Sequence, residues 1–465
     1  MKTNEYQAAT DARIAEGLVV RLRADLLERV RGCFASTRGW LQAGKYVTAV
    51  ASDLERCNGW MIAQACGDRS ADATQRLLNR AVWDTDGAMS EVRRFAAEGL
   101  DAAAASSNKA RMRIAALDES GQAKAGTATA GVKRQYMGCA GRVANGINTV
   151  HLAYVREKTG HALVGARQWI PAEQLGDERI AAATGLPDDL AFATKGRLAL
   201  ALCREAWLDG MVFDFVCGDE VYGACTELRG GLEEHGQAYV LRVAKSFTLA
   251  LGGRQVKASD AVKRLLKAKR RWEVRSAGRG SKGQRWYSWA WIATDSPRHC
   301  LLVRRHLGSG ELAFHYCFVP EGQVAVKARL VRAAGLRWPV EECFEFAKDH
   351  FGLDQCQARL YGAIRRHLVL VVAALAICAV TAAQVRRRAA AQAPAPVRPD
   401  QAPPGDPGLI PLTVNEIRKI PAAALRVIHD TDHEHHWLTY RRRHQARSAW
   451  YHQRTRLGRS YDLPR

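Results

Sequence analysis

Apolar residues recur at spacings of three and four through most of the first hundred residues, and strand-like alternation is absent. This pattern predicts a helical N-terminal domain over residues 1–105. Asn58 and Gly59 resemble a helix C-cap. The segment Gln75–Arg80 reads as a basic helix, which makes the domain a candidate for DNA contact. A helical packing module fits the pattern as well.

The pattern changes to short apolar runs with glycine breaks after a small polar joint at residues 101–110. Helical segments lie between some of these runs, and alternation of strands and helices is the pattern of an α/β fold. The first part of an α/β core is expected over residues 106–245. Strands are predicted at 112–117, 131–136, 146–155, 212–216 and 238–243, and helices at 194–208 and 225–235.

The sequence pattern changes again over residues 246–327, where it predicts a β-rich insertion. Arg285–Trp291 alternates aromatic and smaller residues, and Gly308–Gly310 lies between two strand-like runs, as in a hairpin. Helical pattern returns over residues 328–388, which are expected to complete the core.

Leu368–Ala383 is an apolar run with arginines on both sides. It is slightly shorter than the roughly 18–20 residues that span a bilayer, and its flanks show no charge asymmetry. A buried core helix is the expected structure, and no membrane partner is expected. The polar N-terminus lacks a signal peptide, and the 12 cysteines include no CxxC pair, so reduced thiols of a cytoplasmic protein are expected.

Residues 389–411 are rich in Pro and Ala and predict an extended linker. Residues 412–465 form a basic tail in which aromatic residues alternate with arginines. Such a tail suits phosphate contact with base stacking, and a disordered solubilising tail fits equally. His433–His436 could bind a transition metal, but the spacing of a four-ligand zinc site is absent, so we expect no metal there.

The charge of the chain narrows the choice of partners. Its 465 residues contain 69 Lys and Arg against 47 Asp and Glu, for a net charge of +22 and a pI near 9.8. A surplus of this size favours a polyanionic partner, with nucleic acid ahead of an anionic membrane. A soluble basic protein without such a partner is the plainer alternative.

Three acidic residues are candidates for a metal-binding catalytic site. Asp118 and Asp219 come directly after predicted strands, where sites of open α/β sheets form. Pro339 suits a helix start, which places Glu341 in the first turn and Lys348 two turns later on the same face. Three carboxylates brought together repel one another unless cations neutralise them, and hard oxygen ligands select Mg²⁺ or Mn²⁺. Two such ions can drive an in-line phosphodiester displacement.

In these stretches the sequence resembles the DDE transposases of bacterial insertion sequences, within the RNase H-like superfamily. Arg337, Glu341 and Lys348 fit the last three positions of a Tyr-x2-Arg-x3-Glu-x6-Lys signature, and Ala334 stands at the Tyr position. The motifs around the two aspartates resemble the family in the same chain order: Leu117-Asp118-Glu119-Ser120-Gly121 and Gly218-Asp219-Glu220-Val221-Tyr222-Gly223.

The resemblance implies an RNase H-like core split by the β-rich insertion. It implies cutting at terminal inverted repeats and joining of the 3′-OH ends to target DNA, with two Mg²⁺ or Mn²⁺ ions. Asp118, Asp219 and Glu341 would be the catalytic and metal-binding residues. DNA phosphates would be bound by Arg337, Lys348, Tyr222 and Arg142. A dimer on double-stranded DNA and a cytoplasmic, nucleoid-associated location in a bacterium are the matching expectations.

Several alternatives stay open from the sequence. Glu345 shares the helix face of Glu341, whereas Glu342 points about 100° away around the helix. Trp286, Trp289 and Trp291 are candidates for holding a flipped base, although packing within a sheet also explains their spacing. After Ser120 and Gly121, relatives usually have an aromatic residue and paired lysines, some of which are replaced here by Gln122 and Ala125. These departures near Lys124, with Ala334, also fit a decayed or domesticated DNA-binding protein that keeps the fold without catalysis.

Overall fold

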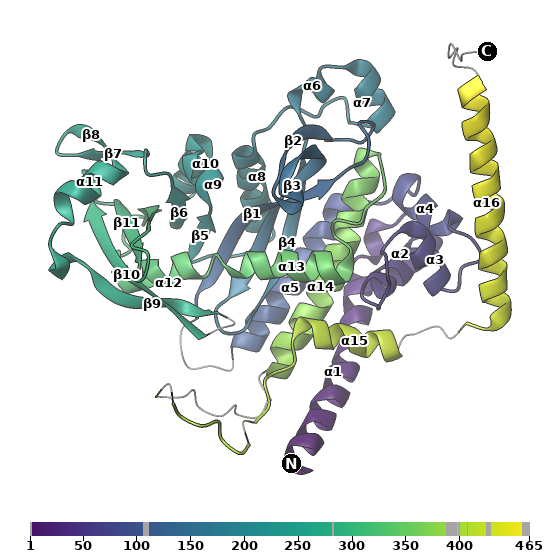
Figure 1. Cartoon of the computed structure of the whole chain (residues 1–465), viewed down its shortest axis with the longest axis horizontal. Coiled ribbons are helices and arrows are strands. Elements are labelled where there is room, and N and C mark those ends of the chain that lie inside the picture. The colour runs from purple at the N-terminus through teal and green to yellow at the C-terminus, as the bar shows by residue number, and fades with distance from the viewer. Residues whose placement is uncertain are drawn as a thin grey trace.

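The computed structural model describes residues 2–105, 111–280, 283–386, 398, 400–406, 408–424 and 429–457. A ten-stranded sheet runs through the centre of the molecule (Figure 1). In the core of this sheet, β3 pairs antiparallel with β1, and β1, β5 and β6 are parallel to one another. This mixed α/β sheet is consistent with an RNase H-like fold. The core strands are β1 (Arg113–Ala123), β2 (Lys133–Met137), β3 (Arg142–Arg156), β4 (Gly160–Trp169), β5 (Phe215–Gly218) and β6 (Tyr239–Val243).

Strand β3 is long enough to pair with two neighbours along the same edge. Its first residues pair with β2, and the stretch from Asn148 onward pairs with β4. The residues of β4 were not predicted as a strand. In β1 the strand continues past Leu117, where the sequence predicted its end, because pairing with β3 extends to Ala123. Asp118 therefore lies inside a strand, and Asp219 follows one as predicted.

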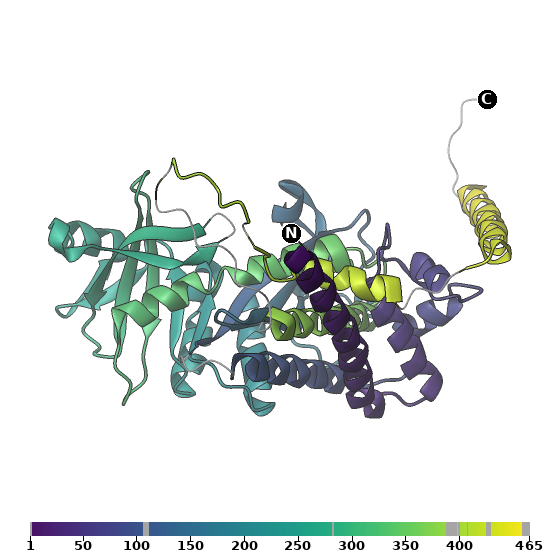
Figure 2. The ribbon, with the colours of Figure 1, turned by 90° about the horizontal axis from the view of Figure 1, so that it is seen from below.

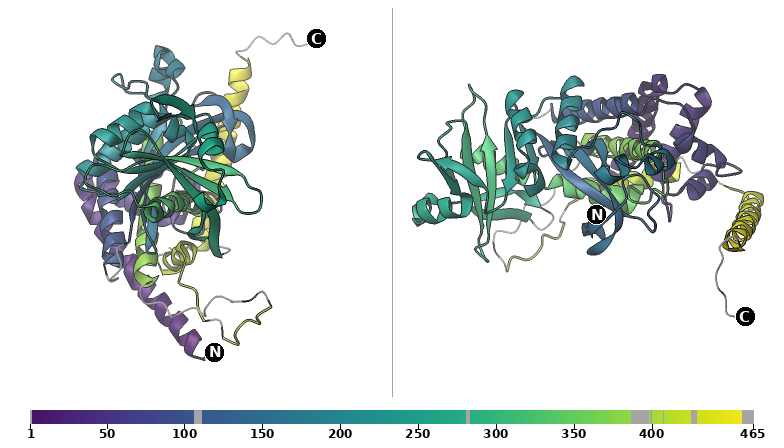
Figure 3. Two further views of the ribbon diagram at one scale, coloured as in Figure 1. Left: turned by 90° about the vertical axis from the view of Figure 1, so that its left-hand side faces the viewer. Right: turned by 90° about the horizontal axis from the view of Figure 1, so that it is seen from above.

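Four strands of the β-rich stretch, β9 to β12, continue the core sheet, whereas β7 and β8 pair with each other in a separate two-stranded sheet. Strand β12 pairs with β6, and β11, β10 and β9 follow outward (Figures 1 and 3). The predicted hairpin around Ser309 joins β11 to β12. The other elements of this stretch are β7 (Thr248–Leu251), β8 (Arg254–Lys257), α11 (Ala258–Leu265), β9 (Glu273–Gly280), β10 (Gly283–Ala293), β11 (His299–His306) and β12 (Leu312–Phe318), with a 3-10 turn at Lys269–Arg271.

The helical N-terminal region packs on the core through the apolar helix α14 (Tyr361–Arg386). This helix is long and apolar enough to cross a membrane, but 94% of its apolar window is buried inside the fold. It lies against β4 on one side and against α5 and α1 on another. The interpretation of this run as a core helix matches its burial. The N-terminal helices are α1 (Lys2–Arg29), α2 (Thr37–Val50), α3 (Gly59–Ala65), α4 (Asp72–Asn79) and α5 (Thr85–Ala104), with a 3-10 turn at Arg31–Cys33.

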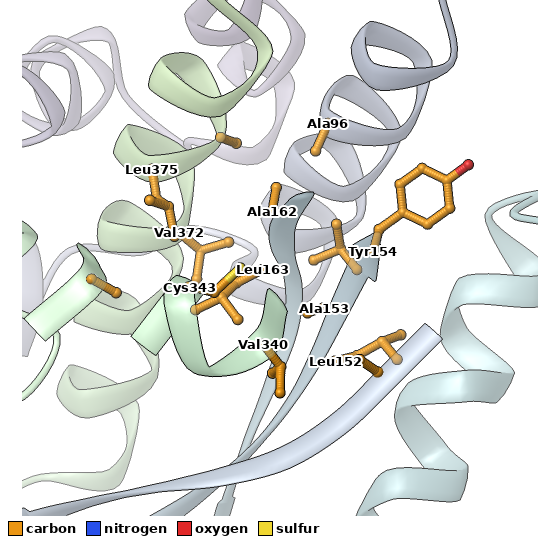
Figure 4. Packing of buried hydrophobic residues seen from close by; sticks show 14 of the residues in the cluster. Ala96, Leu152, Ala153, Tyr154, Ala162, Leu163, Val340, Cys343, Val372 and Leu375 are labelled. Carbon is orange, nitrogen blue, oxygen red and sulfur yellow. The ribbon is translucent and has the colours of Figure 1, made fainter. Parts of the chain in front are cut away.

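Two apolar residues of α13 (Pro339–Phe351) pack into the same core. Figure 4 shows Val340 and Cys343 beside Leu163 of β4 and Val372 of α14. Pro339 begins the helix, and Gly352 ends it with a φ of 68°, a left-handed conformation that favours glycine. Helix α12 (Lys327–Gly335) precedes it. The packing fixes the position of the turn that carries Glu341.

The remaining helices cover the sheet and form the C-terminal region. They are α6 (Ala172–Leu175), α7 (Glu178–Thr184), α8 (Lys195–Leu208), α9 (Glu220–Ala224), α10 (Thr226–Glu234), α15 (Val414–Ala424) and α16 (Thr431–Leu457), and a 3-10 turn spans Gly138–Ala140. Helix α15 lies beside α1 (Figure 2). Much of the predicted linker, 389–411, falls outside the described residues.

Candidate functional site

The sheet brings the two predicted aspartates together. Strands β1 and β5 are parallel neighbours, and Leu117 lies opposite Gly218 in their register. The next residue on each strand is an aspartate, so Asp118 and Asp219 lie at the same level of the sheet. Asp219 is also the N-cap of α9, since its Oδ1 accepts a hydrogen bond of 2.9 Å from the Val221 amide.

A glycine keeps α9 close to the sheet behind Asp219. A Cβ added at Gly223 would lie 1.8 Å from the carbonyl oxygen of Arg242 in β6. Any larger residue would push α9 away from β6 and move its N-cap. The motif that carries the second aspartate therefore needs Gly223 for packing.

Arg337 joins the first aspartate to the glutamate. Its Nη1 lies 2.6 Å from Asp118 Oδ2, and its Nη2 lies 3.1 Å from Glu341 Oε1. The side chains of Asp118 and Arg337 are only 13% and 19% exposed, whereas that of Glu341 is 43% exposed. The negative charge of Asp219 also acts on the Arg337 guanidinium. One guanidinium thus contacts two of the three predicted acids and feels the charge of the third.

Burial dominates the electrostatics of the aspartates. It raises the pKa of Asp118 to about 6, although the Arg337 guanidinium opposes this change. Burial and the nearby Glu119 carboxylate also raise the pKa of Asp219. Raised pKa values mean that the ionised carboxylates are costly here, and a cation at this point would stabilise them.

The chemistry of the donors fits a hard divalent cation such as Mg²⁺, because the site offers carboxylate oxygens from three elements. Among the residues that the structure describes, however, no three Asp, Glu, His or Cys side chains lie close enough to hold a metal ion. Arg337 contacts one oxygen of each carboxylate, Asp118 Oδ2 and Glu341 Oε1, and leaves the other oxygen of each to a possible ligand. A cation between these acids would either share them with the Arg337 guanidinium or displace it.

Glu119 forms a second charged cluster that the sequence did not assign. Its Oε1 lies 2.6 Å from Lys195 Nζ, and its Oε2 accepts a 3.0 Å hydrogen bond from the Tyr222 hydroxyl. Tyr222 is completely buried. The predicted phosphate contact by Tyr222 is therefore corrected, since its hydroxyl is used inside the protein. Tyr222 instead ties α9 to β1 next to the aspartates.

The two other predicted phosphate ligands have different surroundings. Lys348 is half-buried in α13, with its Nζ 5.9 Å from the centre of the Phe344 ring. Arg142 is exposed at the start of β3, nine residues from His151, which pairs with Asp118. Nine strand residues span roughly 30 Å. The structure brings Arg337 to the acids, but not Arg142.

The three glutamates of α13 have different surroundings. Glu341 contacts Arg337, whereas Glu345 is exposed and makes no hydrogen bond or ion pair with any described residue. Glu342 Oε2 lies 3.1 Å from His161 Nε2, and His161 Nδ1 lies 3.1 Å from Cys343 Sγ. These contacts favour Glu341 as the third acid of the site and give Glu342 a structural role.

The pair of His161 and Glu342 makes stability depend on pH. Burial lowers the pKa of His161, but Cys343 and Glu342 outweigh it and raise that pKa to about 10. The hydrogen bond from His161 lowers the pKa of Glu342 below its ordinary value. The pair therefore stabilises the fold fully between about pH 4.5 and 6.5, and this contribution is lost as pH rises toward 10.

Glu342→Gln is expected to lower the free energy of unfolding by about 1 kcal/mol at pH 6, a value kept small because Glu342 is partly exposed. The difference from wild type should shrink as pH approaches 10, where His161 loses its proton. Urea denaturation at the two pH values measures this, with Glu345→Gln as the matched control. An equal loss of unfolding free energy at both pH values would show that the charge of His161 does not contribute to stability.

The three tryptophans of β10 separate into different environments. Trp289 is 1% exposed, and its Nε1 donates a 3.3 Å hydrogen bond to the Arg275 carbonyl, so it packs within the sheet. Trp286 and Trp291 are 54% and 37% exposed. Only these two present rings that could stack on a base.

The histidines of the C-terminal region bond to the protein backbone. His433 Nε2 lies 3.1 Å from the Gln64 carbonyl oxygen, and His436 Nε2 lies 2.7 Å from that of Arg69. Both contacts help to attach α16 to the N-terminal helices.

A mixed sheet with acidic residues on adjacent parallel strands and a third on a following helix is typical of nucleases that cut phosphodiester bonds with divalent cations. Residues 29–304, more than half of the chain, match the DDE superfamily endonucleases. The protein therefore belongs to the DDE superfamily endonucleases, as the resemblance to DDE transposases predicted. Enzymes of this superfamily use divalent metals and act on DNA. A search of curated proteins finds no match to the chain.

Proposed function

We propose that the protein is a DNA transposase that cuts at the terminal inverted repeats of an insertion sequence and joins the 3′-OH ends to target DNA. The strongest support is that Asp118 and Asp219 follow paired positions on adjacent strands and that Arg337 joins Asp118 to Glu341. Membership of the DDE superfamily endonucleases supports DNA cutting as part of this activity. The net charge of +22 suits a polyanionic substrate.

The three acids are the proposed ligands of two Mg²⁺ or Mn²⁺ ions. When bound, such ions activate the attacking hydroxyl and stabilise the leaving oxygen of each phosphoryl transfer. Asp118 must lose its proton to act as a ligand, and its pKa of about 6 keeps most of it ionised at neutral pH. Arg337, once released from Asp118, is free to hold a phosphate of the cut strand, and Lys348 is proposed to hold another.

The proposed division of the chain follows the sequence prediction. Residues 1–105 and 412–465 would contact DNA outside the catalytic core, which consists of 106–245 and 328–388 with the insertion 246–327 between them. Cutting and joining require two transposon ends to be held together. We therefore propose that the protein acts as a dimer on double-stranded DNA, within the bacterial nucleoid.

Helix α16 is the structural basis for a DNA contact at the C-terminal end. Its first half is anchored, because Trp437 is fully buried beside α3 and its Nε1 donates a 2.9 Å hydrogen bond to the Asp68 carbonyl. Its second half is exposed and lies at the opposite end of the molecule from the insertion strands (Figures 1 and 3). This half carries Arg447, Arg454 and Arg456, and no acid follows Glu434 in the helix. Such a surface favours phosphate contact over an apolar partner.

Replacing Arg447, Arg454 and Arg456 together by Gln should weaken duplex binding and reduce its salt dependence. Loss of three phosphate contacts would lower the slope of log affinity against log salt by about 2 to 3. Fluorescence anisotropy over a salt series measures this, with His452→Gln on the same exposed segment as control. An unchanged slope in the triple variant would remove α16 from the proposed DNA surface.

Mg²⁺-dependent nicking of a duplex that carries the ends of the element tests the proposed activity. A catalytically decayed or domesticated DNA-binding protein is the alternative. The contact of Arg337 with two of the acids, and Ala334 at the signature's tyrosine position, are the features that favour it. That protein would bind the duplex and leave it uncut.

A further inference from the structure

Arg304 of β11 makes no ion pair with any described residue, although the charge of Glu311 acts on it. Its guanidinium lies 4.5 Å from the centre of the Tyr287 ring, and its Nε is buried with no hydrogen-bond partner. It makes no hydrogen bond or ion pair with any described residue. Burial lowers the pKa of this guanidinium from its ordinary value. A half-buried guanidinium that no acid contacts directly has donors left for an anionic ligand.

Arg304 shares one face of the sheet with two other polar residues. It lies opposite Ala313 in β12, and His315 is two residues farther along that strand, on the same side. His315 in turn lies opposite Arg242 of β6. Residues that pair across strands point to the same face. Arg304, His315 and Arg242 therefore form one cluster across three strands, which we call the Arg304 cluster.

His315 adds a second unpartnered group to the Arg304 cluster. Its side chain is almost wholly buried, at 8% exposed, yet its Nδ1 has no hydrogen-bond partner. Burial, together with the positive charges of Arg304 and Arg242, lowers the pKa of His315 to about 3. The imidazole is therefore neutral at physiological pH. Two independent side chains thus leave polar atoms unsatisfied at one place.

The Arg304 cluster adjoins the candidate catalytic site. Arg242 Nε lies 3.1 Å from Glu220 Oε1, and Glu220 is the residue after Asp219. The charge of Arg337, which contacts Asp118, also acts on His315. Strands β6, β12 and β11 thus carry positive charge outward from the acids over one face of the sheet. A DNA strand held at the acids would meet this face next.

We propose that the Arg304 cluster binds a backbone phosphate of the DNA strand on the insertion side of the cut. The proposal rests on the proposed function in one respect, that the substrate is DNA. Phosphate oxygens accept hydrogen bonds from the Arg304 guanidinium, with Arg242 and the neutral imidazole of His315 beside it. The cluster positions the strand and leaves the chemistry to the three acids.

Binding of a fluorescent duplex in EDTA tests this without any need for cleavage. Arg304→Ala and Arg305→Ala form a matched pair, because the two arginines are adjacent on β11 and point to opposite faces. Arg305 lies on the Trp272 ring, 4.3 Å from its centre. We expect Arg304→Ala to weaken binding about tenfold and to lower the salt slope by about 0.9. Arg305→Ala should match wild type.

Duplexes with single neutral methylphosphonate linkages locate the contact. At one position in the duplex, the neutral linkage should weaken DNA binding by wild type and leave binding by Arg304→Ala unaffected. Binding by Arg304→Lys should be weakened in part, because lysine keeps the positive charge. Equal binding by the alanine pair, or equal losses, would overturn the proposal. A second result would also overturn it: inorganic phosphate raises the thermal stability of wild type but not of Arg304→Ala, while both proteins bind DNA equally. The cluster would then be a site for a free anion and not for DNA. Failure of wild type to cut in Mg²⁺ would count against the proposed activity and leave this binding result standing.

Discussion

Glu341→Gln is expected to reduce Mg²⁺-dependent cutting by at least about 1000-fold, whereas Glu345→Gln should cut within about twofold of wild type. Glu341 shares the Arg337 guanidinium with Asp118, and Glu345 is exposed without a polar contact among the described residues. Gln has the shape of Glu and can still accept a hydrogen bond from Arg337. The substitution therefore removes a charged ligand while leaving the helix intact.

Initial cutting rates on one duplex, at saturating Mg²⁺, compare the two variants directly. Thermal denaturation in EDTA shows whether each is folded. The reverse result, an inactive Glu345→Gln and an active Glu341→Gln, would move the third acid one turn along α13. Wild-type cutting rates in both variants would mean that neither glutamate holds a catalytic metal.

Asp219→Asn is expected to abolish cutting, with a loss of about 1000-fold or more, and to leave DNA binding unchanged. Asparagine is as good an N-cap as aspartate, so α9 should keep its hydrogen bond from Val221. The variant should also lose the thermal stabilisation that Mg²⁺ gives the wild type, because ligand binding to the folded state raises its stability. Cleavage assays, anisotropy and thermal shifts measure the three properties.

The matched control is Glu227→Gln, which removes an exposed carboxylate from the neighbouring helix α10. It should cut DNA and respond to Mg²⁺ as wild type does. Retained cutting by Asp219→Asn would show that Asp219 is an N-cap alone. Loss of DNA binding together with cutting would show that the substitution damages more than the metal site.

The sequence predicted the core strands well where apolar runs were bounded by glycine or polar turns. Strands β5 and β6 lie close to their predicted limits, and Asp219 follows β5 as expected. Strand β1 was predicted too short, because the polar residues after Leu117 resemble a turn. Pairing with β3 keeps them extended, and that contact lies far away in the sequence.

Local chemistry was also misread at one helix end. Asn58 and Gly59 resembled a C-cap, but Asn58 is the N-cap of α3, where its Oδ1 accepts hydrogen bonds from the amides of Trp60 and Met61. Asn suits an N-cap, and it also tolerates the left-handed conformation of a C-cap. The sequence therefore does not decide whether the helix ends before Asn58 or begins after it.

The candidate site was predictable as a set of acids and not as a set of contacts. Motif order predicted Asp118, Asp219 and Glu341 as the acids of the site, but only the structure shows Arg337 between two of them. The burial of Tyr222 and the role of Glu119 depend on the packing of α9 against β1. A polar residue beside each aspartate gave no sign of which one would face inward.

The Arg304 cluster could not have been found from the sequence. Arg304 and Arg305 are adjacent and chemically identical, and only the strand register assigns them to opposite faces. His315 and Arg242 are 73 positions apart in the chain, yet they lie opposite each other in the sheet. Cross-strand pairing over such separations has no local signal.

The central claim is tested most directly by incubating the wild-type protein and Asp219→Asn with a duplex that joins the element's end to flanking DNA, in Mg²⁺ and in EDTA. Both proteins should bind the duplex equally. Only the wild type in Mg²⁺ should produce a nick at the end of the inverted repeat, with a free 3′-OH that a polymerase can extend. Equal binding without a cut by either protein would contradict the account and identify a DNA-binding protein that retains the fold without catalysis.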